Sequence, residues 1–140
     1  MGLVVMTCIR YIRRLLASNT NSYRVNNDKE LMHKLKEAVK QKIDKRKSQF
    51  HESHSKVYND NLQIEIDTLE WVLEQIQMYS KVMTTERIKA IVEAKIKDLE
   101  RRMEKVKYIW DTDTLFTKLE TLKWALYVIH AIKNRETLLV

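Results

Sequence analysis

The sequence predicts an all-α protein: an antiparallel four-helix bundle built from a duplicated αα-hairpin, with an additional amphipathic helix at the N-terminus. Three observations predict this fold class. The 140 residues contain no proline and a single glycine, so almost nothing in the chain interrupts a helix. Apolar residues recur at helical spacings of three and four positions. The chain also matches itself when it is shifted by 53 residues.

The internal match contains 11 identities over positions 36–76 and needs no gap. Its most distinctive part is the run Thr-Leu-x-Trp-x-Leu-x-x-Ile, which begins at Thr68 and again at Thr121. The other identities pair Lys36, Val39, Lys42, Ile43, Asp60 and Leu62 with Lys89, Val92, Lys95, Ile96, Asp113 and Leu115. Roughly three identities would be expected by chance in such a repeat search. We therefore expect two regions: 1–27, and 28–140 with copies at about 28–80 and 81–133.

The first copy is predicted to contain two helices. One starts after Asn27, which has the side chain of an N-cap, and weakens at residues 51–55, a poor helix-forming stretch. The next starts at Asn59 or Asp60.

The second copy repeats this arrangement. Thr84 or Thr85 is predicted to start a helix, and the polar cluster 111–114 separates it from the last helix. Connections of only a few residues make successive helices antiparallel. Because neither hairpin can bury its apolar stripe alone, the two copies are expected to pack together as a bundle.

The segment before the repeat is predicted to be a separate element. Residues 3–16 have one apolar helix face and one face with three arginines, and residues 17–27 are rich in Asn and Ser, which is typical of a linker. A basic amphipathic helix can bind an anionic membrane surface. We expect it to dock on its own bundle instead, which leaves peripheral membrane association as a third alternative for function.

Charge and cysteine content restrict the environment and the partners. The chain carries 26 Lys and Arg against 19 Asp and Glu, a formal charge of +7, and it contains only Cys8 as a thiol. A lone cysteine is typical of a reducing compartment, and the longest uncharged runs, nine residues each, are shorter than the roughly 20 residues that span a bilayer. We therefore expect a cytoplasmic protein. Its basic charge permits nucleic acid, an anionic membrane or an acidic protein as partner and does not choose among them.

The two helices that carry the repeated motif are apolar on two sides. On a helical wheel with the core stripe through Leu69, residues spaced by seven fall on the opposite face, where an outer helix should be polar. Either the N-terminal helix or another chain must cover this second face. Trp and Tyr dominate the energetics of protein interfaces. The predicted partner-binding residues are Ile64, Trp71, Met78, Trp124, Tyr127 and Val128.

A basic helix face offers an alternative function in nucleic-acid binding. The predicted phosphate-binding residues are Lys29, Lys36, Lys40, Lys45, Arg46, Lys47, Arg101 and Arg102. The second copy has Glu93 and Glu100 where the first has Lys40 and Lys47. The basic stripe is therefore not repeated although the apolar pattern is, which favours a solvated face.

No pattern predicts catalysis, a cofactor or a metal site. Glu30 and His33 have the Glu-x-x-His spacing of di-iron bundles, but the residue equivalent to His33 is Glu86, and no second motif follows. We therefore expect a non-enzymatic interaction protein, a regulator or inhibitor that binds a protein partner or forms a homodimer. A small, duplicated, Lys- and Ile-rich helical chain is also typical of phage and mobile-element products.

Overall fold

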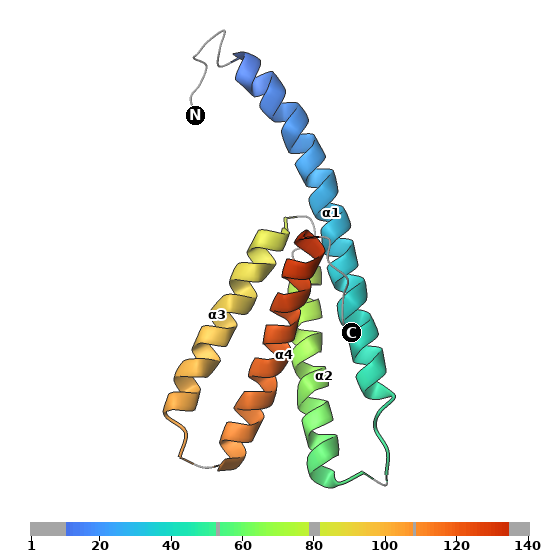
Figure 1. Cartoon of the computed structure of the whole chain (residues 1–140), viewed down its shortest axis with the longest axis vertical. Coiled ribbons are helices and arrows are strands. Elements are labelled where there is room, and N and C mark those ends of the chain that lie inside the picture. Colours follow the sequence, from blue (N-terminus) through green and yellow to red (C-terminus); the bar gives the residue numbers. More distant parts are fainter. Residues whose placement is uncertain (1–10, 53, 79–81, 108, 135–140) are drawn as a thin grey trace. The chain divides into compact units, whose positions relative to one another are not determined.

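The computed structural model of the chain describes residues 11–52, 54–78, 82–107 and 109–134. These residues form four helices and no strand, which confirms the predicted all-α class: α1 (Tyr11–Lys47), α2 (Lys56–Met78), α3 (Thr85–Glu104) and α4 (Ile109–Lys133) (Figure 1). In this described part of the chain, no helix has an apolar stretch long enough to cross a membrane.

Helix α1 continues without a break from Tyr11 to Lys47. The linker predicted at 17–27 is therefore wrong, as is the helix start after Asn27, because both positions lie inside this helix. The segment lacks glycine and proline, and Asn, Ser and Thr each cost at most about 0.7 kcal/mol in a helix interior. The predicted helix 3–16 falls partly outside the described residues, which begin at Tyr11.

The starts of α2 and α3 depend on hydroxyl caps. The Thr84 hydroxyl accepts a hydrogen bond from the Arg87 backbone N–H at 3.2 Å, which confirms Thr84 as the N-cap of α3. Helix α2 begins earlier than predicted, because the Ser55 hydroxyl accepts a hydrogen bond from the Tyr58 N–H at 3.1 Å. Ser55 therefore takes the capping role that we expected of Asn59 or Asp60.

Two predicted breaks differ from the structure. Helix α1 ends at Lys47, before the weak stretch 51–55. Helix α4 already begins at Ile109, so the polar cluster 111–114 lies in its first turns instead of before it. Asp and Thr are well tolerated in a first helical turn, where free backbone N–H groups favour acceptors and negative charge.

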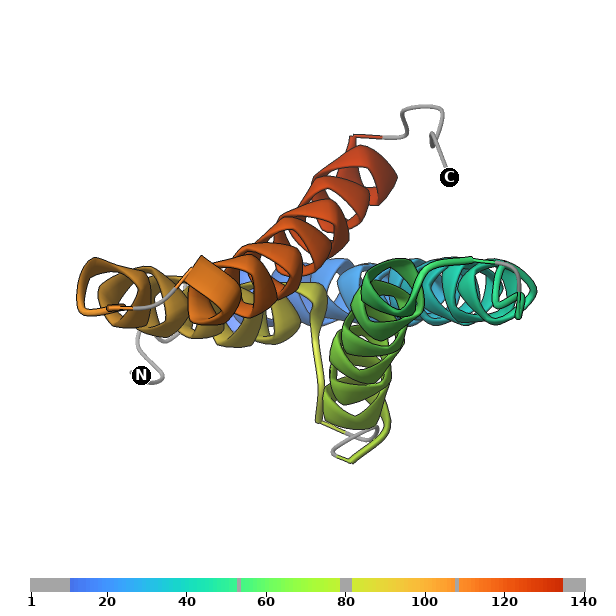
Figure 2. The same ribbon diagram turned by 90° about the horizontal axis from the view of Figure 1, so that it is seen from below.

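The chain divides into two compact units, residues 1–30 and 31–140. The first unit contains the N-terminal part of α1. In the second unit, successive helices run in opposite directions (Figure 1). Seen from below, α4 lies beside α3, and α2 lies beside the end of α1 (Figure 2). Helix α4 packs against both α2 and α3, whereas α2 and α3 make little contact.

All four helices contribute to one apolar core in the unit 31–140. Val39, Leu69, Val92 and Leu122 are each at most 1% exposed, and each comes from a different helix. Two hydroxyls are also buried there. Thr68 donates to the Ile64 carbonyl at 2.7 Å and Thr121 to the Thr117 carbonyl at 2.8 Å, so both are satisfied within their own helices.

Candidate binding clefts

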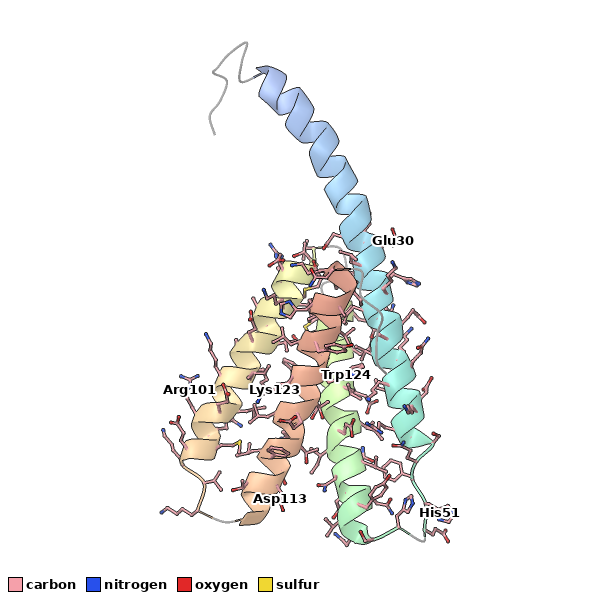
Figure 3. All side chains as sticks on the ribbon, viewed as in Figure 1. Glu30, His51, Arg101, Asp113, Lys123 and Trp124 are labelled. Carbon is pink, nitrogen blue, oxygen red and sulfur yellow. The ribbon has the colours of Figure 1, made fainter. Side chains whose placement is uncertain are left out.

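Both tryptophans of the repeated motif are half-buried, and each is covered by a lysine from the other predicted hairpin. The Lys42 ammonium of α1 lies 5.0 Å from the ring centroid of Trp124. Trp124 is on α4, where Figure 3 labels it. The Lys95 ammonium of α3 lies 5.7 Å from the ring centroid of Trp71 on α2. Both distances are within the range of cation–π attraction. The second apolar side of each Trp helix is thus partly covered within the chain, by an element that we had not predicted.

A cleft of about 330 Å³ opens beside Trp124, between α1, α2 and α4. We call it the Trp124 cleft. It is lined by Lys42, Arg46, Glu65, Phe116, Thr117, Glu120, Thr121 and Trp124. Phe116 is 54% exposed, an unusual fraction for a large aromatic side chain at the rim of a cleft.

A second, smaller cleft of about 190 Å³ opens beside Trp71, between α2, α3 and α4. We call it the Trp71 cleft. It is lined by Asp67, Thr68, Trp71, Lys95, Leu99, Lys118 and Leu122. Most of its floor is apolar, since Leu99 and Leu122 are core residues that are each 1% exposed.

The two clefts correspond to each other through the 53-residue offset. Six lining positions of one cleft have their equivalents in the other. Lysine, threonine, tryptophan and an acidic residue recur at four of them: Lys42 and Lys95, Thr121 and Thr68, Trp124 and Trp71, and Glu120 and Asp67. The other two differ, because Arg46 and Glu65 in the Trp124 cleft correspond to Leu99 and Lys118 in the Trp71 cleft.

An ion pair occupies one side of the Trp124 cleft. The Arg46 Nε donates to Glu65 Oε1 at 2.7 Å, and its Nη1 donates to Gln49 Oε1 at 2.8 Å. Both members of the ion pair are partly buried, which limits screening by solvent. Arg46, one of the predicted phosphate-binding residues, is therefore held by protein groups in this structure.

Two polar groups in the Trp124 cleft have incomplete partners within the described residues. Lys42 is only 8% exposed and takes part in none of the ion pairs described. Burial lowers the pKa of its ammonium below the ordinary 10.5, Arg46 lowers it further, and Glu65 opposes the shift. The buried Trp124 Nε1 has no hydrogen-bond acceptor. An unpaired buried donor such as the Trp124 Nε1 favours a ligand that supplies an acceptor.

The Lys42 shift predicts a pH dependence of stability. With a pKa below 10.5 in the folded state, the protein carries the burial penalty of the charged form at neutral pH and loses it as pH rises toward 10.5. We expect the free energy of unfolding of the wild type to rise relative to that of Lys42→Met as the pH rises toward 10.5. Urea denaturation of both proteins measures the difference, and a difference that is flat or falls with pH contradicts the expectation.

The predicted partner-binding residues do not form one exposed face. Met78 is 52% exposed, while Ile64 and Tyr127 are half-buried. Val128 is wrongly assigned to this face, since it is fully buried in the core. The wheel placed it opposite Leu122 and Leu126, but α4 packs on two neighbouring helices and so buries a wider arc.

The predicted phosphate-binding residues are not brought together either. Lys29, Lys45 and Lys47 are exposed on α1, and Lys36 and Lys40 are half-buried there. Arg101 and Arg102 lie on α3, on the other side of the unit, with Asp98 carboxylate oxygens at 3.8 and 3.2 Å (Figure 3). Among the residues that the structure describes, no three His, Cys, Asp or Glu side chains are grouped to hold a metal ion.

Lys42, Lys95 and Phe116 line the clefts but were not among the predicted site residues. A signal for the lysines was present, because both are identical in the two copies and lie next to buried core positions. Phe116 gave no signal of its own, since a helical wheel does not show which apolar residue lies at the rim of a cleft.

The fold and the clefts define this chain as a small all-α protein with two related tryptophan clefts. Comparison with known proteins adds no relative: no family model, no curated protein and no solved structure matches the chain.

Proposed function

We propose that residues 28–140 form an antiparallel four-helix bundle that arose by duplication of one αα-hairpin. The correspondence of six lining positions in two separate clefts supports this, because it relates the two halves in space as well as in sequence. Equivalent positions are also buried to similar degrees, as with Val39 and Val92, which are both 0% exposed. In each cleft the tryptophan comes from one half of the repeat and the lysine above it from the other half. Each cleft therefore depends on both halves.

We propose that the protein is a non-enzymatic interaction module that regulates or inhibits a protein partner by binding it through the tryptophan clefts. The observation that carries this proposal is that both repeated tryptophans line clefts instead of being sealed in the core. Tryptophan is enriched among the residues that supply most of the binding energy of protein interfaces, and such residues lie in well-packed pockets. Exposed Phe116 extends the apolar surface of the Trp124 cleft to its rim.

The size of the clefts favours side chains of a protein over a small-molecule ligand. Sites for drug-sized ligands are typically about 300–1,000 Å³ and enclose most of the ligand. The Trp71 cleft, at about 190 Å³, is smaller than this range, and the Trp124 cleft, at about 330 Å³, is at its lower limit. Rigid helices with such clefts would act by binding the surface of a partner, and this binding would block that surface or recruit the partner.

Affinity capture with matched variants tests the proposal. Phe116→Glu introduces a charge at the rim of the Trp124 cleft, where the side chain is 54% exposed, and Val57→Glu makes the same kind of change at a residue that is 68% exposed and lines neither cleft. We expect a protein partner, or a second copy of the chain, that is retained by the wild type and by Val57→Glu and lost by Phe116→Glu. The readout is quantitative mass spectrometry of the proteins captured from the lysate with and without nuclease treatment.

The same experiment separates the alternatives. Capture that disappears after nuclease treatment would favour the nucleic-acid-binding function of the basic α1 residues. Retention of every captured protein by Phe116→Glu would contradict binding through the Trp124 cleft. Circular dichroism of both variants checks that the introduced charge leaves the helices intact, which we expect at exposed positions.

A further inference from the structure

The two clefts share their architecture but differ in charge. Where the Trp124 cleft has Glu65, the equivalent position of the Trp71 cleft is Lys118. Where the first has Arg46, the second has Leu99. The internal ion pair of the Trp124 cleft thus has no counterpart in the Trp71 cleft, which combines two lysines with one carboxylate.

The two lysines of the Trp71 cleft are available to an anion. Within the described part of the chain, neither Lys95 nor Lys118 belongs to an ion pair. The one carboxylate of the cleft, Asp67, accepts a hydrogen bond from the Gln63 side chain at 2.7 Å and is exposed to solvent. Both lysines line the cleft and are half-buried, and the Lys95 ammonium lies 5.7 Å from the centroid of the Trp71 ring. Partial burial reduces the screening of their charge by water.

The rest of the Trp71 cleft is apolar. Trp71 forms one wall, and the floor contains Leu99 and Leu122, each 1% exposed. A charge that binds beside such surface interacts more strongly with the lysines than it would in bulk water. The volume of about 190 Å³ is suited to a group of side-chain size. The cleft therefore combines a site for negative charge with a site for an apolar group.

We infer that the Trp71 cleft binds the carboxylate of an acidic side chain that a protein partner presents beside an apolar residue. The carboxylate lies between Lys95 and Lys118, and the apolar residue packs against Trp71 and the adjacent leucine surface. This inference rests on the proposed function and specifies the chemistry of the partner. The reversed charge at the equivalent position agrees with this inference, since among the described residues only the Trp124 cleft pairs one of its cations with an acid of its own.

A peptide titration followed by NMR tests the inference on the full chain. The probe is the blocked dipeptide acetyl-Phe-Glu-amide, and its neutral control is acetyl-Phe-Gln-amide. We expect the acidic peptide to shift the indole signal of Trp71 and the amide signals around Lys118, with about tenfold weaker binding of the neutral peptide. Equal binding of the two peptides, or shifts away from the Trp71 cleft, would overturn the inference.

Two variants with the same change in net charge separate local from general electrostatics. Lys118→Glu reproduces the acidic residue of the other cleft, whereas Lys97→Glu changes an exposed lysine of α3 that does not line the cleft. We expect Lys118→Glu to weaken binding of the acidic peptide about tenfold and Lys97→Glu to leave it nearly unchanged. Equal weakening by both variants would overturn the inference. Lys118→Gln, which adds no negative charge, provides the same test if Lys118→Glu perturbs the fold.

Other outcomes are also decisive. A short oligothymidine that shifts the same signals more strongly than the acidic peptide would overturn the assignment to an acidic side chain, since it would indicate a phosphate site. The titration reports on the Trp71 cleft, and the capture experiment reports on Phe116 at the Trp124 cleft. If the capture experiment finds a partner that depends on Phe116 while the titration shows no preference for the acidic peptide, the proposed function stays in place. Only this inference is then overturned.

Discussion

Leu122→Ala is expected to lower the free energy of unfolding by about 2–5 kcal/mol. Leu122 is 1% exposed in the core, and its helix, α4, packs against both α2 and α3. The truncation removes apolar contacts and leaves a cavity that the neighbouring helices fill only partly. Urea denaturation followed by circular dichroism measures the change.

The repeat extends this prediction to a second site. Leu69 is the equivalent of Leu122 and is 0% exposed, so Leu69→Ala is expected to cost a similar amount, within about 1 kcal/mol. The matched control is Phe116→Ala, which truncates a larger side chain that is 54% exposed and should change stability by less than about 1 kcal/mol. A loss for Leu122→Ala no greater than that of the control would contradict the described core.

Truncation of either repeated tryptophan is expected to have the next largest effect. Trp71→Ala and Trp124→Ala should each lower the free energy of unfolding by about 2–3 kcal/mol, less than the 3–5 kcal/mol of a fully buried Trp, because both rings are half-buried. Each change also removes the ring beneath a lysine ammonium. The native helicity should remain nearly unchanged at low urea. If neither substitution lowers the free energy of unfolding, the description of the two tryptophans as packed walls of the clefts is contradicted.

The fold class was predictable from composition together with the spacing of apolar residues, and the reason is physical. With no proline and a single glycine, the chain has almost no residue that ends a helix, and the apolar spacing of three and four fixes which faces are buried. The wrong linker prediction has the same physical reason: residues 17–27 contain many weak helix formers but no glycine or proline, so α1 passes through them.

The clefts were only partly predictable. The wheel correctly found that Trp71 and Trp124 lie off the core stripe, since both are half-buried in the structure. It gave no information about which neighbouring element would cover them, because that depends on how the hairpins pack. Lysine is counted as polar in such a pattern, yet its long aliphatic stem covers apolar surface while its ammonium stays near water. The placement of a lysine from one hairpin over the tryptophan of the other could therefore be found only from three-dimensional coordinates.

The central claim is that each hairpin supplies the lysine that covers the tryptophan of the other. A double-mutant cycle between Lys42→Met and Trp124→Leu measures it most directly, with Lys42→Met and Trp71→Leu as the control pair. The contact at 5.0 Å predicts a coupling free energy of about 0.5–1 kcal/mol for the first pair and below about 0.3 kcal/mol for the second. Coupling of Lys42 to Trp71 instead of Trp124 would contradict the placement of each lysine over the tryptophan of the other hairpin. It would also contradict the residues given as lining the two clefts.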